Sequence, residues 1–138
     1  MFCISRHGAD FRDLMAKGLI DIMFANEAEI LALMETEDFE AAVAAAAAQV
    51  PTLVVTRSER GAIAISNGER ASCGAEPIEK VVDTTGAGDL FAAGFLSGQA
   101  NGQSVEQSLK LGALCAAEII SHVGARLQVD LKALAAKL

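Results

Sequence analysis

Residues 83–98, DTTGAGDLFAAGFLSG, constrain the fold of this chain more than any other stretch. They follow the apolar pair Val81-Val82 and lead through threonines and glycines into an apolar pattern with helical spacing. If the apolar pair ends a strand, residues 84–88 form a strand-to-helix turn, where backbone N–H groups lack intrahelical partners and the helix dipole is positive. Because Gly86 and Gly88 let the backbone approach a ligand closely, the pattern predicts a phosphate-binding turn.

The next residue, Asp89, falls in the first turn of the predicted helix. A carboxylate there repels a bound phosphate unless it accepts a proton from an attacking hydroxyl, so this arrangement favours phosphoryl transfer. A purely structural interpretation stays open, because threonine, aspartate and glycine are ordinary residues at helix starts. Two better-known loops do not fit: a Walker loop needs a lysine after the glycines, and Phe91 stands where GxGxxG requires glycine. The second mismatch disfavours a dinucleotide-binding oxidoreductase.

The rest of the chain alternates short apolar runs with helical patterns. We expect strands at 2–5, 21–25, 52–56 and 62–66, a short strand near 69–72 after an Asn67-Gly68 turn, and a strand end at 81–83. The spacing predicts helices at 9–19, 26–36, 38–49, 86–99, 105–122 and from Leu131 onward. This order is typical of an α/β protein with a Rossmann-type, mostly parallel sheet flanked by helices.

Composition excludes several classes of protein. The 138 residues, 52% of them hydrophobic, suffice for one globular domain with its own core. A net charge of −7 leaves no cationic surface for nucleic acid or an anionic membrane, and no apolar run reaches the roughly 18 residues of a membrane span. Three scattered cysteines, Cys3, Cys73 and Cys115, are typical of reduced thiols in a cytoplasmic protein. We interpret them as packing residues, and the lone His7 and His122 as structural or solvated.

Several motifs together resemble the ribokinase or PfkB family of carbohydrate and nucleoside kinases. DTTGAGD at 83–89 matches the family's C-terminal signature, NEAE at 26–29 its NxxE motif, VVTRSERGA at 54–62 its nucleotide loop between two strands, and HVGA at 122–125 the segment beside the adenine. The branch it most resembles contains bacterial adenosine kinases and related sugar kinases. The resemblance implies a ribokinase-like fold and an ATP-dependent kinase that phosphorylates a hydroxyl of a sugar or nucleoside.

The resemblance also implies a role for each motif residue. Asp89 is expected to be the catalytic base, and the amides of Gly86, Ala87 and Gly88 are expected to stabilise the transferred phosphoryl group. Asn26 and Glu29 are expected to hold the water shell of Mg²⁺; without the resemblance, a helix cap and a solvated acid are the simpler interpretation. The other implied site residues are Thr56, Ser58, Gly61, Gly124 and Ala125 at the nucleotide, and Asp83 and Thr85 at a monovalent cation such as K⁺.

One position departs from the family pattern. Many members carry Leu-Gly where this chain has Arg57-Ser58. A loop arginine can contact phosphate, but we expect Arg57 to be a surface residue.

Members of the family are considerably longer than this chain. We therefore expect residues 1–138 to be the C-terminal nucleotide-binding and catalytic part of a ribokinase-like domain, without the N-terminal part and its lid. An unpaired sheet edge at the strand expected over 2–5 favours completion by another chain or a homo-oligomer. The alternative function is a catalytically incomplete nucleotide-binding fragment or a structural remnant. The acceptor stays open among sugars, sugar acids, adenosine and other nucleosides.

Overall fold

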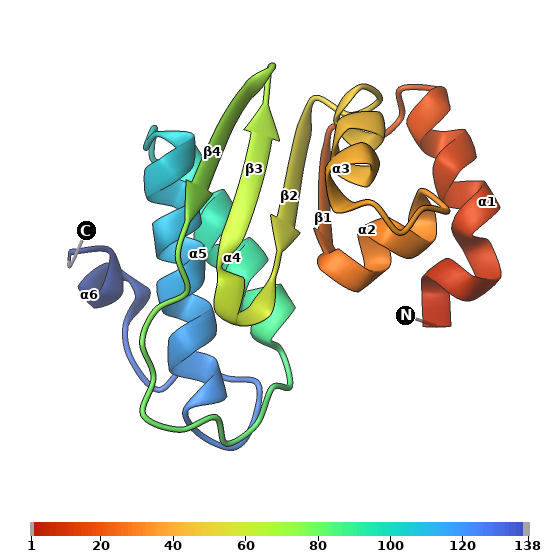
Figure 1. The fold of residues 1–138 in the computed structure, drawn as a ribbon. Helices are drawn as coiled ribbons and strands as arrows, with labels where there is room; N and C mark the ends of the chain where they lie inside the picture. Colours follow the sequence, from red (N-terminus) through yellow and green to blue (C-terminus); the bar gives the residue numbers. More distant parts are fainter. Residues whose placement is uncertain (1, 137–138) are drawn as a thin grey trace. The chain divides into compact units, whose positions relative to one another are not determined.

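The computed structural model of the chain describes residues 2–136 and shows an α/β fold (Figure 1). Four strands form one sheet in the order β1 (Ile22–Asn26), β2 (Thr52–Thr56), β3 (Ala62–Ser66) and β4 (Glu69–Cys73). The helices are α1 (Phe2–Ala16), α2 (Glu27–Leu33), α3 (Phe39–Ala47), α4 (Ala87–Ala100), α5 (Val105–Ile120) and α6 (Leu131–Ala135), with a 3-10 helix η1 (Ser58–Arg60). Across the described residues, none of the helices is both long and apolar enough to span a membrane.

The sheet is mixed. Strands β1 and β2 pair in parallel, with Ile22 opposite Thr52 and Asn26 opposite Thr56. Figure 1 shows β3 running opposite to β2, and β4 opposite to β3. The predicted Asn67-Gly68 turn joins β3 and β4, and both of its residues adopt positive φ, 50° and 85°. The predicted α/β class is therefore confirmed, and β3 and β4 add an antiparallel excursion to its parallel pair.

The chain divides into two compact units. The first comprises the chain up to Arg57 together with Ala64–Arg70, and the second comprises Ser58–Ile63 together with the chain from Ala71 onward.

In the first unit, α2 and α3 pack on the parallel strands. Asn26 and Asp38 cap the two helices: the Asn26 side chain accepts from the Glu29 amide, and the Asp38 side chain accepts from the Ala41 amide. The buried face of α3 consists of Ala42, Val43 and Ala46. Small side chains let this alanine-rich helix pack closely on α2 and β2.

Arg57, at the end of β2, joins two helices of the same unit. Its guanidinium donates twice to the Glu27 carboxylate of α2, at 3.3 Å each, and its central carbon lies 3.9 Å from the centre of the Phe39 ring of α3. The Arg57 and Glu27 side chains are only 21% and 19% exposed. The expectation of a surface arginine is therefore wrong, because a carboxylate and an aromatic face on neighbouring helices cover its guanidinium.

In the second unit, α4 and α5 pack closely along their lengths (Figure 1). Glycines make this approach possible: a Cβ on Gly94 would lie 2.8 Å from Cys115 Sγ, and a Cβ on Gly112 would lie 2.8 Å from the Phe91 carbonyl oxygen. The large side chains buried in this unit include Phe91, Phe95, Leu109 and Ile119. Residue size at the helix contact thus sets how close the two axes come.

Two predicted strands are absent, which corrects the sequence interpretation. Residues 2–5 belong to α1, which is kinked at His7 (φ −126°, ψ 16°). Ile4, Gly8, Phe11 and Met15 are its partly or fully buried positions on the two sides of the kink. Within residues 2–136, no strand pairs with residues 81–83; instead the Val82 and Asp83 amides donate to the Ile120 carbonyl at the end of α5, at 2.8 and 3.4 Å. A short apolar run becomes a strand only where a neighbouring strand offers it a ladder.

Candidate functional site

The predicted anion turn lies in the second unit, at the start of α4. Gly86 is the residue before the helix and has φ 81°, in the left-handed region. No side chain caps this helix, and the Gly86 carbonyl accepts the first intrahelical bond from the Leu90 amide at 2.9 Å. The Ala87 amide already donates to the Thr84 carbonyl at 3.2 Å. The Gly88 amide, by contrast, has no acceptor within residues 2–136, so it is available to an anion.

Asp89 lies in the first turn of α4 and is exposed to solvent. Beside it, a Cβ on Gly88 would meet no atom within 4 Å, so the approach to this turn is open. The arrangement places the Asp89 carboxylate and the free Gly88 amide within a single helical turn. It has the components that a proton acceptor beside an anion site requires.

Asp83 ties this turn to a segment 41 residues further along the chain. One carboxylate oxygen accepts from the Thr85 amide at 2.9 Å, and the other accepts from the Gly124 amide at 3.1 Å. Gly86 packs on the same segment, because a Cβ on it would lie 2.8 Å from the Ala125 Cβ. The structure thus brings together the predicted anion turn and the predicted nucleotide residues Gly124 and Ala125.

These hydrogen bonds make the turn sensitive to acid. Bonds from the Thr85 side chain, and then from the Thr85 and Gly124 amides, lower the pKa of Asp83 below its usual value. A lowered pKa stabilises the folded state above the unfolded value of about 3.9, and that contribution is lost as pH falls through the folded pKa.

We expect the NMR shift of the Gly124 amide to titrate with a midpoint below about 3.9 as the chain is acidified, because Asp83 protonation weakens the bond to it. Asp83→Asn serves as the control and removes this titration. A midpoint at or above that value would contradict the role given to Asp83.

A network of hydrogen bonds around Glu118, which the sequence interpretation missed, holds the same segment. Glu118 of α5 lies 3.0 Å from His122 Nε2, and its Oε1 also accepts from the Gln128 amide at 2.9 Å. The i, i+4 spacing of Glu118 and His122 is the signal that can identify such a pair in a helical sequence. His122 therefore has the structural role that was expected of it, and Glu118 is its partner.

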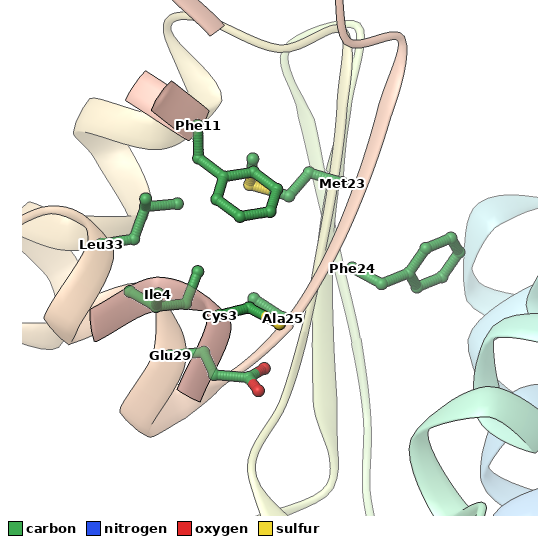
Figure 2. Close-up of a pocket in the computed structure, with 8 residues that line it drawn as sticks. All are labelled: Cys3, Ile4, Phe11, Met23, Phe24, Ala25, Glu29 and Leu33. Atoms are coloured by element: carbon green, nitrogen blue, oxygen red, sulfur yellow. The ribbon is translucent and has the colours of Figure 1, made fainter. Parts of the chain in front are cut away.

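The NxxE residues lie in the first unit, where β1 meets α2. The Asn26 and Glu29 side chains each accept from the other's backbone amide, both at 2.9 Å, which forms a capping box. Figure 2 shows the Glu29 carboxylate at one end of a pocket of about 370 Å³. The pocket is otherwise lined by Cys3, Ile4, Phe11, Met23, Phe24, Ala25 and Leu33.

Asn26 and Glu29 fit a Mg²⁺ ion that is held through its water shell, because they offer too few oxygen ligands to bind a metal ion directly by themselves. One amide and one carboxylate supply oxygen ligands, and within residues 2–136 no cluster of three or more His, Cys, Asp or Glu side chains surrounds a possible metal position. An ion held here would keep most of its waters, as Mg²⁺ usually does. The capping box shows that Asn26 also caps α2, as the structural interpretation of this motif expects.

The loop between β2 and β3 carries the other predicted nucleotide residues. Thr56 ends β2 in the first unit, whereas Ser58 and Gly61 belong to the second unit. Ser58 has φ 51° and Gly61 has φ 80°. A Cβ on Gly61 would lie 2.0 Å from the Cys73 carbonyl oxygen, so glycine is required there by packing.

The fold and this turn define a class: an α/β protein in which a glycine-led turn opens a helix that has an acid in its first turn. Residues 4–131 match the pfkB family of carbohydrate kinases. The chain belongs to this family, which confirms the resemblance seen in its motifs.

Three relatives show the extent of the similarity. The cytidine kinase of Thermococcus kodakarensis is 36% identical over 118 residues, which are 82% of this chain and 42% of that protein. The crystal structure of adenosine kinase from Sinorhizobium meliloti is 46% identical, with a TM-score of 0.94 over 99% of this chain and 42% of its own. A putative ribokinase II from E. coli in complex with ATP and Mg²⁺ is 26% identical, with a TM-score of 0.79 over 91% of this chain and 42% of its own. The chain thus spans about two fifths of the length of these relatives.

Proposed function

We propose that this chain is the catalytic part of an ATP-dependent kinase that transfers the γ-phosphate to a hydroxyl of a sugar or a nucleoside. The observation that carries the proposal is the open turn before α4, where left-handed Gly86 leads a helix without a side-chain cap and Asp89 stands exposed in the first turn. The relatives support it, because they include a cytidine kinase and an adenosine kinase.

In this proposal Asp89 accepts a proton, and the amides of the turn stabilise the negative charge. Asp89 accepts the proton of the acceptor hydroxyl while that oxygen bonds to the γ-phosphorus and the bond from the γ-phosphorus to ADP breaks. Amides at Gly86, Ala87 and Gly88 face the charge that develops on the phosphoryl oxygens. The Ala87 amide, which donates to Thr84, must leave that bond to take part. Gly88 is therefore the strongest candidate of the three.

The other residues bind rather than react. We propose that Thr56, Ser58, Gly61, Gly124 and Ala125 contact the nucleotide. Asn26 and Glu29 would hold Mg²⁺ through water, and the ion would neutralise phosphate charge when bound. Asp83 and Thr85 are a weaker proposal for K⁺, because both Asp83 oxygens already accept backbone amides.

We further propose that residues 1–138 correspond to the C-terminal nucleotide-binding and catalytic part of a ribokinase-like domain and act in the cytoplasm. The extent of the match supports the first statement, since the chain covers 42% of the cytidine kinase. The alternative is a chain that binds nucleotide without transfer. This alternative is favoured if the residues that bind the sugar or nucleoside lie outside residues 1–138 or belong to a second copy of the chain.

The deciding experiment measures ADP release and MgATP binding by this chain with a panel of sugars, adenosine and cytidine, together with its mass in solution. We expect MgATP binding and ADP release that depends on the acceptor. Binding without release would support the alternative. Failure to bind MgATP would overturn both, and binding of NADH instead would favour the dinucleotide-binding class.

A further inference from the structure

One buried carboxylate holds both ends of the segment 122–128. Glu118 Oε1 lies 3.0 Å from His122 Nε2 at the start of the segment and 2.9 Å from the Gln128 amide at its end. The Glu118 and His122 side chains are 12% and 16% exposed. The seven residues 122–128, which have no regular structure, are therefore closed into a loop by a single oxygen atom.

The middle of the same segment contacts the anion turn. The Gly124 amide donates to Asp83, and Ala125 packs on Gly86. Within the described residues, no backbone bond from residues 122–128 to a helix or strand supplements these contacts. Glu118 therefore supplies the other hydrogen bonds that hold the segment, at its two ends.

The Glu118 carboxylate uses only one of its two oxygens for these contacts. Its second oxygen, Oε2, is buried and has no hydrogen-bond partner within residues 2–136. Buried carboxylates are tolerated where they accept strong hydrogen bonds, and leaving one oxygen without a donor weakens the gain. The carboxylate therefore acts on the segment through Oε1.

We propose that Glu118 is a positioning residue that holds segment 122–128 against the anion turn and thereby sets the affinity for the nucleotide. It touches neither the phosphates nor the acceptor and acts through Gly124 and Ala125. The nucleotide part of this inference rests on the proposed function, whereas the positioning part does not.

The test uses hydrogen exchange in the whole chain at neutral pH. In Glu118→Ala we expect the Gly124 and Gln128 amides to exchange about tenfold faster or more, because the variant loses the acceptor oxygen that closes the segment. Leu111 and Cys115, buried in α5, report global opening and should be unchanged. Glu118→Gln should stay near wild type, since its amide oxygen can replace Oε1. Glu106→Ala is the matched control, an exposed acid on the same helix that pairs with Lys110.

Unchanged exchange at Gly124 and Gln128, or an equal rise at Leu111 and Cys115, would overturn the positioning role. If Glu118→Ala does not fold, His122→Ala decides instead: it removes one of the two ends, and faster exchange confined to 122–128 is then required.

MgATP binding by the same variants tests the second step. We expect Glu118→Ala to weaken binding about tenfold and Glu118→Gln to restore it. Equal affinity despite a loosened segment would overturn the link to the nucleotide. If the wild-type chain binds no MgATP, the proposed function fails, and the exchange data alone decide the positioning role.

Discussion

Asp89→Asn should abolish acceptor-dependent turnover, with a loss of about 10²–10⁴-fold, and leave MgATP binding nearly intact. The amide keeps the size of the side chain and cannot accept the proton of the acceptor hydroxyl. Asp89 is exposed, so its replacement removes only a favourable interaction with the helix dipole, worth a few tenths of a kcal/mol. Steady-state rates and a binding isotherm on the same preparation separate the two effects.

The matched control for this experiment is Glu106→Gln. Glu106 is also an exposed acid in the first turn of a helix, α5, and its partner is Lys110 rather than any residue of the anion turn. It should retain wild-type turnover. Unchanged turnover in Asp89→Asn would refute the base assignment, and an equal loss in both variants would point to net charge as the cause.

Gly61→Ala should destabilise the chain by about 3 kcal/mol or more. Two effects add at this position. The φ of 80° costs any residue with a Cβ about 1–2 kcal/mol. In addition, the new Cβ would lie 2.0 Å from the Cys73 carbonyl oxygen and 2.7 Å from the Gly74 carbonyl carbon, so backbone must move. The shift in the urea midpoint measures the loss.

Gly68→Ala isolates the first effect. Gly68 has φ 85°, and a Cβ on it would meet no atom within 4 Å. It should cost only about 1–2 kcal/mol. Similar losses in the two variants would show that the contact with Cys73 relaxes freely. Because Gly61→Ala is expected to lower the stability of the fold, a loss of stability in this variant does not by itself test whether Gly61 contacts the nucleotide.

Local signals predicted most of the secondary structure correctly. The Asn26 cap, the apolar runs that became β1 to β3, and the helical spacing of α5 each depend on neighbours in the sequence. The predictions failed at 2–5 and 81–83, where a short apolar run fits a strand and another structure equally well. Residues 2–5 form the start of α1, and within residues 2–136 no strand pairs with 81–83.

Around the candidate site, too, features set by neighbouring residues were predicted and contacts between distant residues were not. DTTGAGD identifies its own turn, because conformation at Gly86 and the first turn of α4 are set within a few residues. The Arg57 and Glu27 pair, by contrast, joins residues 30 apart and was not predicted. Nothing in either local pattern indicates the other partner.

By itself, then, the sequence determined the family, the α/β class and the turn that presents Asp89, since each is encoded in short-range spacing and residue type. Only the tertiary structure decided which distant residues support that turn. Asp83 bonds to Gly124 and Gly86 packs on Ala125, while Glu118 closes segment 122–128, to which Gly124 and Ala125 belong. These contacts depend on how α4 and α5 pack, and packing is set by the sum of many side-chain volumes rather than by any one motif.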